Sequence, residues 1–143
     1  MAKVSRRKAR EDAVIILYQS DLLCKSAAKV LEKEIEFGKV LDNFTKEIVL
    51  GVSENLEIID KRIKKVVENW SLDRIAIIDR NIIRVAIYEM FYKDEIPLKV
   101  SVDEAIEIAK VLGQKEDTPK FVNGILGKIL LDIQDSKKIK NYN

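Results

Sequence analysis

SLDRIAIIDRNIIRVAIYEMF, residues 71–91, is the most apolar stretch of this 143-residue chain. Its apolar side chains occupy nearly every angular position of a helix, which predicts a central helix buried on almost all sides. The segment is too short and too charged to cross a bilayer, and no Gly or Pro divides it into short strands. We expect the helix to begin at Ser71. Among its charged residues are Asp73, Arg74, Asp79, Arg80 and Arg84.

Apolar residues recur at spacings of three and four on both sides of this segment, which is the pattern of amphipathic helices. Only two prolines and five glycines interrupt the chain, which favours helix over turn-rich β structure. Region 44–70 fits either one long helix or two helices that meet near Gly51 to Asn55. The expected helices span 9–23, 27–38, 44–70, 71–91, 101–112 and 118–133, and the tail is expected to fray.

Capping residues mark several of the expected helix ends. Gly124, which follows Asn123 inside the last apolar segment, costs about 1 kcal/mol relative to Ala, so it predicts a close approach between two helices. The end signals are Ser5 and Thr118 as N-caps, Pro119 in a first turn, Ser101 with Glu104 as a capping box, and Gly113 after a helix.

Composition and helix count together predict an all-α fold, a compact bundle of about seven helices. We expect residues 1–135 to form a single domain and residues 136–143 to form a polar, basic C-terminal tail. No apolar run reaches the roughly 20 residues of a membrane span, and Glu11 and Asp12 interrupt any signal-peptide core. The lone Cys24 is expected to be a small buried hydrophobe, and a reducing cytoplasm fits this composition.

The first ten residues carry five basic side chains and no acid. Since the whole chain has a net charge of only +2, the rest of the chain is net acidic and the basic charge is local. Cations at a helix start oppose the helix dipole, so a cluster without compensating acids favours an anionic ligand such as nucleic acid. The alternative is a solvated helix start that aids solubility. The five residues are Lys3, Arg6, Arg7, Lys8 and Arg10.

A second candidate site lies at the start of the last expected helix, in the segment Glu116–Gly124. The unpaired backbone N–H groups of a helix N-terminus attract anions, and Lys120 adds a positive charge there. Phe121 could offer a face on which a base stacks. Taken alone, however, the segment is better explained with Phe121 as the first core residue and Asp117 as an acid favoured by the helix dipole.

Catalysis is the weak interpretation of this chain. It has no histidine, which excludes histidine acid–base chemistry and histidine-ligated metals, and a single cysteine cannot build a thiolate zinc site. We therefore expect no enzyme activity, no cofactor and no metal. The remaining carboxylates are expected to be solvated helix faces and caps. They are Asp60, Asp73, Asp79, Asp103, Glu104 and Asp117.

Four blocks in this order resemble the NusB family of bacterial transcription antitermination factors. They are RRKARE at 6–11, DRNIIRVAIYEM at 79–90, IPLKVSVDEAIEIAK at 96–110 and KFVNGIL at 120–126. The resemblance implies two small packed helical bundles that bind the boxA element of ribosomal RNA transcripts without catalysis. It also implies a protein partner, the small-subunit ribosomal protein NusE, within the transcription elongation complex.

The resemblance also assigns residues. It places a protein-partner surface around Tyr18 and Asp79. Many family members have Ser-His where this chain has Thr118-Pro119, so one backbone donor and one side chain differ there. The implied RNA-binding residues are Arg6, Arg7 and Arg10 with their neighbours Lys3 and Lys8, together with Asp117, Lys120 and Phe121.

Two other functions stay open at this point. One is an RNA-recognition domain like that of ribosomal RNA cytosine methyltransferases, although nothing like a methyltransferase domain follows residue 143. The other is a helical protein–protein adaptor whose basic patch meets an acidic partner. The choice between a monomer and a homodimer that forms over the RNA surface also stays open, as does the RNA sequence preferred.

Overall fold

The chain folds entirely into helices over the residues that its computed structural model describes. These are residues 5–67 and 71–142, with side chains described up to residue 136. The all-α prediction is confirmed for this part of the chain, which contains seven α-helices, one 3₁₀ turn and no strand. The elements are α1 (Arg6–Leu23), α2 (Ala27–Glu36), α3 (Asn43–Glu54), α4 (Leu56–Val66), η1 (Leu72–Arg74), α5 (Ile77–Tyr92), α6 (Leu98–Leu112) and α7 (Thr118–Tyr142).

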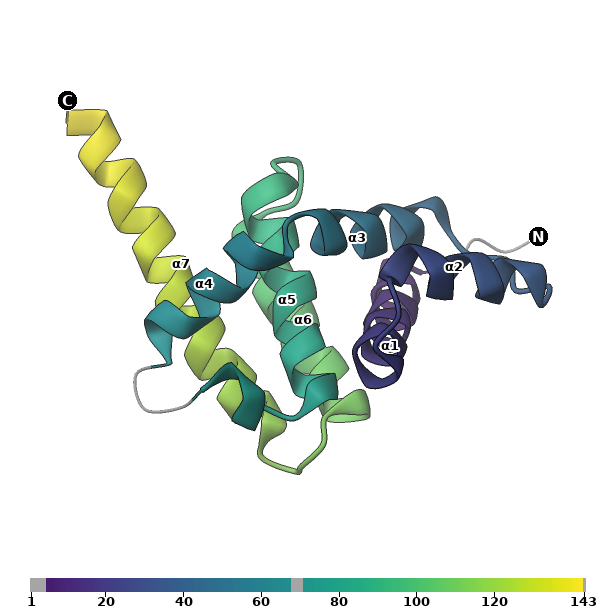
Figure 1. Cartoon of the computed structure of the whole chain (residues 1–143). Helices are drawn as coiled ribbons and strands as arrows, with labels where there is room; N and C mark the ends of the chain where they lie inside the picture. The colour runs from purple at the N-terminus through teal and green to yellow at the C-terminus, as the bar shows by residue number, and fades with distance from the viewer. Residues whose placement is uncertain (1–4, 68–70, 143) are drawn as a thin grey trace.

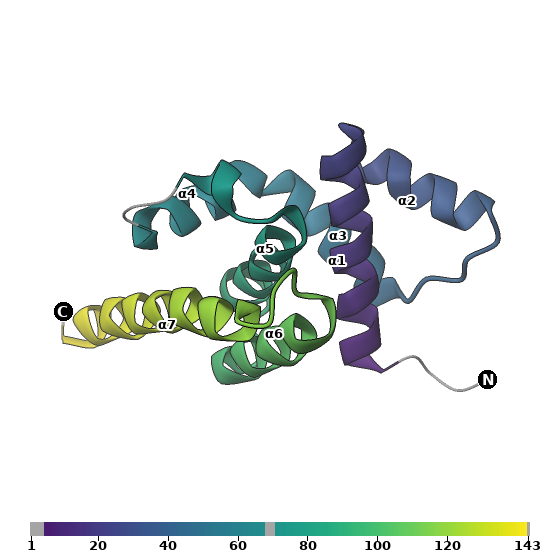
Figure 2. The same ribbon diagram turned by 90° about the horizontal axis from the view of Figure 1, so that it is seen from below.

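The helices form two groups around α5, as the resemblance implied. Helices α1, α2 and α3 pack against one another, and α4, α6 and α7 surround α5 in the second group. Helix α5 also contacts α1 and α3, so it joins the two groups (Figure 1). Figure 2 shows α2 at one end of the molecule and α4 and α7 at the other. Helix α5 is therefore the central helix that segment 71–91 predicts.

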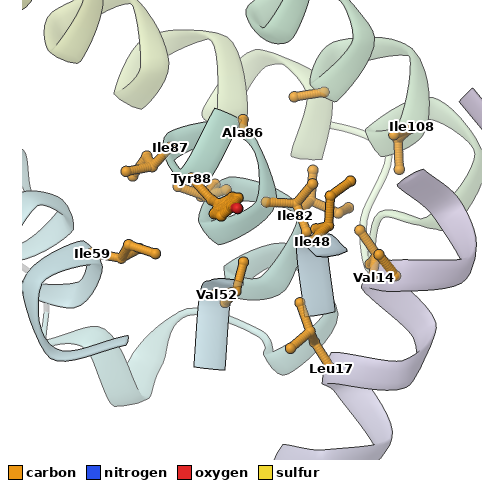
Figure 3. Close-up of a cluster of buried hydrophobic side chains, with 14 of the residues drawn as sticks. Val14, Leu17, Ile48, Val52, Ile59, Ile82, Ala86, Ile87, Tyr88 and Ile108 are labelled. Carbon is orange, nitrogen blue, oxygen red and sulfur yellow. The ribbon is translucent and has the colours of Figure 1, made fainter. Parts of the chain in front are cut away.

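The core gathers on α5, where Ile83 and Ile87 have no measurable exposure. Figure 3 shows labelled side chains of α1, α3, α4 and α6 around those of α5. Helix α3 comes closest at Gly51, since a Cβ on this residue would overlap the ring of Tyr88. The absence of a side chain at Gly51 thus lets α3 lie against α5. The labelled core residues are Val14, Leu17, Ile48, Val52, Ile59, Ile82, Ala86, Ile87, Tyr88 and Ile108.

The helix boundaries agree with the prediction in some places and differ in others. The central helix begins at Ile77 rather than at residue 71, because Ile75 and Ala76 are extended after the 3₁₀ turn. Region 44–70 forms two helices that meet at Asn55, which is the second of the two predicted arrangements, and Trp70 lies outside the described residues. Helix α7 continues to Tyr142, so its backbone is not frayed from residue 136 on.

The predicted capping box at Ser101 and Glu104 is wrong. Helix α6 starts one turn earlier, with Pro97 at the N-cap position, and Ser101 is 1% exposed inside the helix. Thr118 is the first residue of α7 and not its N-cap, whereas two other end signals hold. Ser5 caps α1 through a hydrogen bond that its hydroxyl accepts from the Lys8 N–H, and α6 ends at Gly113.

Two small residues lie in surroundings opposite to those predicted. Cys24 is exposed, and it ends α1 in the left-handed conformation with φ 54° instead of packing in the core. Gly124 is exposed on α7, and nothing lies within 4 Å of the position that its Cβ would occupy, so it marks no helix contact. None of the helices in the described ranges combines the length and apolarity needed to cross a membrane.

Candidate nucleic-acid interface

The first turn of α1 presents Arg6 to solvent above an aromatic ring. The guanidinium carbon of Arg6 lies 3.9 Å from the centroid of the Phe44 ring, a cation–π arrangement that fixes the side chain while leaving its donors accessible. No carboxylate lies within the 4.0 Å ion-pair distance of Arg6 among the described residues. Arg6 is therefore the basic residue of this turn best placed to meet an anion.

Arg7 is half-exposed and holds a carboxylate from another helix. Its Nε and Nη2 donate to the two carboxylate oxygens of Glu104 at 2.7 and 3.0 Å. This bidentate hydrogen bonding lowers the pKa of Glu104 and raises that of Arg7. The side chain of Arg7 still has 49% of its surface exposed, so it can offer further donors. Glu104 therefore joins α6 to α1 instead of capping α6.

Arg10 is buried, whereas a phosphate ligand of the kind predicted from the sequence needs an accessible guanidinium. Its side chain donates from Nε and Nη2 to the carboxylate of Glu89 at 2.7–3.0 Å, and these residues are 5% and 1% exposed. A guanidinium held this way joins α1 to the central helix and has no surface on which to receive RNA. Lys8 pairs with Asp12 at 3.1 Å on its own helix, and Lys3 lies outside the described residues. The expectation that the cluster lacks compensating acids is thus wrong for three of its members.

The second part of the site is the α6–α7 loop, which Asp79 shapes from α5. The carboxylate of Asp79 accepts from the Gln114 N–H at 2.9 Å and from the Thr118 hydroxyl at 3.1 Å. The Thr118 oxygen in turn accepts a hydrogen bond from the Lys115 N–H, so it stabilises the loop rather than capping the N-terminus of α7. Because Asp79 is only 7% exposed, it supports the loop from below rather than projecting from the surface.

Beside this loop lies a small hollow of about 150 Å³. Phe121 forms part of its wall and also packs against the core, while Asp117 and the neighbouring Lys120 are exposed. Arg74 from the 3₁₀ turn and Lys115 add two cations to its rim, and the motif analysis identified neither. Lys115 directly precedes the segment singled out in the sequence, whereas Arg74 is brought there only by the fold.

Helix α6 connects the two parts of the site. Its Glu104 lies at Arg7, and nine residues further on Gly113 opens the loop, an axial distance of about 14 Å. Helices α1 and α6 are in contact, and Figure 2 shows the α6–α7 loop close to α1. One extended strand of nucleic acid could thus reach both parts of the site. The first part holds Arg6 and Arg7, and the second holds Lys120 and Phe121.

Tyr18 is half-buried on α1, one turn before a polar network. Asp21 accepts from Arg84 at 2.7 Å and from the Asn81 amide at 3.0 Å, and Arg84 also donates to both oxygens of Asp60. The network fixes the C-terminal half of α1 against α5. Together with Glu104 and Asp79, it shows that three of the carboxylates expected to be solvated are paired. Asp73, Asp103 and Asp117 are exposed as predicted.

Comparison with known proteins supports the resemblance found in the sequence. The model of the NusB family matches residues 7–131. The chain belongs to the NusB family. Relatives named transcription antitermination protein NusB in Bacillus cereus (strain Q1) and Bacillus anthracis are 44% identical over 127 residues, which cover 88% of this chain and 97% of theirs.

Solved NusB structures share the fold. T. maritima NusB is 38% identical with a TM-score of 0.78, covering 90% of this chain and 92% of its own. The solution structure of NusB from Aquifex aeolicus is 25% identical with a TM-score of 0.76, covering 92% and 90%. A crystal structure of the antitermination factors NusB and NusE in complex with dsRNA is 24% identical with a TM-score of 0.74, covering 87% and 94%, and supports the fold alone.

Proposed function

We propose that this chain is a transcription antitermination factor that binds the single-stranded boxA element of ribosomal RNA transcripts together with NusE. It acts without catalysis, in the cytoplasm, as part of the elongation complex. Residues 1–135 form its RNA-binding domain, followed by a basic tail. The observation that carries the proposal is the pair of cation-and-aromatic sites, one at the start of α1 and one at the α6–α7 loop, in a chain of the NusB family.

In the proposed complex, the predicted residues take different roles in binding RNA. Arg6 and Lys120, both exposed, bind phosphates, and Arg7 contributes the donors that Glu104 leaves unused. Phe121 offers the exposed part of its ring to a base, a contact worth about 1–3 kcal/mol. Arg10 supports α1 from the interior.

Three further residues complete the proposed assignment. Asp117 lies beside the hollow, where its carboxylate can accept from a base amino group. Lys3 and Lys8 add attraction at the start of α1. For the NusE contact we retain Tyr18, whose ring is partly exposed, and we give Asp79 the indirect role of holding the neighbouring loop.

A salt titration with boxA-like and scrambled RNA, with and without NusE, tests this function. Three phosphate contacts by Arg6, Arg7 and Lys120 predict a slope of about −2.1 for log affinity against log salt. Affinity should then fall by roughly 18-fold between 50 and 200 mM salt. NusE should tighten binding of the boxA-like RNA more than of the scrambled one.

Arg6→Ala is the discriminating variant, and Arg62→Ala is its matched control. Both arginines are exposed and lie over a phenylalanine ring, with Arg62 3.6 Å from the centroid of Phe91 on the opposite side of the fold. Arg6→Ala should reduce the magnitude of the slope by about 0.7, and Arg62→Ala should leave it unchanged. Equal effects of the two variants would refute the proposed site. No preference for boxA-like RNA and no gain from NusE would favour the protein adaptor instead.

A further inference from the structure

A groove between α1 and α2 lies at the end of the molecule away from α4 and α7 (Figures 1 and 2). It encloses about 480 Å³, a volume within the range of ligand-binding clefts. Its floor includes Val30, and exposed apolar side chains border it. Leu23 has 55% of its surface exposed and Phe37 has 88%. Such an apolar groove on a soluble protein is a candidate interaction surface.

Three lysines border the same groove, namely Lys25, Lys29 and Lys33. All three are exposed, and none has a carboxylate within 4.0 Å among the described side chains. The one acid on the rim, Glu34, pairs with Lys39 at 3.6 Å. Lys29 and Lys33 are four residues apart on α2, so they project from the same face, where like charges repel. Unlike Arg7 and Arg10 of α1, these lysines form no ion pair within 4.0 Å among the described side chains.

We infer that this groove binds an acidic amphipathic helix of a partner protein. The apolar floor selects a protein over a nucleic acid, because phosphates gain nothing from Leu23 and Val30, whereas an apolar helix face buries against them. The lysine row requires acids along the edge of that helix, spaced one turn apart. Since α2 is ten residues long, about 15 Å, the partner contributes roughly three turns.

The groove is separate from the proposed RNA site. Helix α2 packs against α1 and α3, and none of the groove residues belongs to α5, α6 or α7. A loss of binding here and a loss of RNA binding are therefore distinguishable outcomes. The inferred partner helix binds at the α2 end of the molecule, which the proposed RNA site does not include.

The test is an NMR titration of the ¹⁵N-labelled full chain with a synthetic helical peptide. The peptide has about 14 residues, with Leu at positions i, i+3 and i+7 and Glu flanking that face. A scrambled peptide of the same composition is the control. The first peptide should shift the amides of α2 and the end of α1 and should bind more weakly as salt rises. Shifts without preference for this region, or equal binding of the scrambled peptide, would overturn the inference.

Variants test the two halves of the groove separately. Lys29→Glu with Lys33→Glu should weaken peptide binding about tenfold, and Phe37→Ser about fivefold, since all three side chains are exposed and the fold does not depend on them. The matched control, Lys61→Glu with Lys64→Glu, makes the same charge change on exposed lysines of α4 and should have little effect. Equal weakening by both double variants would contradict the inference. So would a single-stranded RNA that shifts the α2 amides where the peptide does not.

Discussion

The buried pair between Arg10 and Glu89 allows a sharp test of how the arginines of α1 divide their roles. Arg10 comes from a cluster that the sequence marks as RNA-binding, yet its guanidinium lies in the interior on the central helix. If the structure is right, replacing Arg10 should harm stability and leave the electrostatics of RNA binding intact. If the sequence prediction is right, the replacement should weaken RNA binding and its salt dependence and leave stability intact.

The expected cost of Arg10→Ala follows from the burial of its partner. Glu89 is 1% exposed, so the variant leaves a carboxylate in the core with no cation, which typically costs about 3–5 kcal/mol. A chain of 143 residues has an unfolding entropy of about 0.3 kcal/mol per kelvin. The melting temperature should therefore fall by roughly 10–17 °C. Urea unfolding and calorimetry measure the two quantities.

A double variant separates stability from RNA binding. Arg10→Met with Glu89→Leu replaces the ion pair with apolar side chains of similar size, and such replacements are often neutral or stabilising. We expect its unfolding free energy to lie within about 1 kcal/mol of the original and its RNA salt slope to be unchanged. Arg7→Ala is the comparison, because its side chain is half-exposed; it should reduce the slope, and the loss of its pair with Glu104 should cost far less stability than Arg10→Ala does.

Two results would refute this reasoning. One is a cost below about 1 kcal/mol for Arg10→Ala, which would mean that Glu89 finds water or another donor. The other is a stable double variant whose salt slope is smaller in magnitude by about 0.7, which would mean that Arg10 reaches a phosphate in the complex.

Three further predictions concern other parts of the fold. Gly51→Ala should destabilise the protein by about 1–3 kcal/mol in urea unfolding, because the new methyl group overlaps the ring of Tyr88. Gly124→Ala should raise the free energy of unfolding by roughly 0.5–1 kcal/mol, since its site is open, and a loss of stability would reveal a helix contact there. Because Arg7 lowers the pKa of Glu104 below its ordinary 4.5, the pair stabilises the fold above that value and loses this contribution as the pH falls through the lowered pKa. Glu104→Gln should therefore be less stable than the original protein at pH 7, and the difference should shrink as the pH falls below 4.5 and through the lowered pKa of Glu104. A constant difference would contradict the assignment.

Local patterns predicted the helices well and their ends less well. Apolar spacing of three and four identifies a helix wherever one face is buried, and Ser5 caps α1 because its hydroxyl needs only a neighbouring N–H. The start of α5 was missed because Ile75 is as apolar as the helix that follows, so periodicity gives no boundary. The start of α6 was missed because Pro97 can begin a helix without the Ser101 signal.

The candidate site could be predicted only in part, because its chemistry depends on contacts between residues far apart in the chain. Glu89 and Glu104 lie 79 and 97 residues from the arginines that they bind, and no local pattern reveals such pairs. From the sequence alone, a carboxylate on a helix is predicted to be solvated, because the cation that pairs with it comes from another helix. Asp79 is the clearest case, since its role depends on a loop that follows it by 35 residues.

Arg6, Arg7 and Arg10 have the same chemistry and lie within five residues, yet each meets a different group. One stacks on a ring in solvent, one shares its donors with Glu104, and one is buried on Glu89. Counting all five basic residues of the first decade as phosphate ligands would give a salt slope of about −3.5 from this helix alone. The tertiary structure leaves two of its arginines accessible. Under the proposed function, α1 then supplies only part of the attraction for RNA, and we expect discrimination between RNA sequences to arise at the α6–α7 loop.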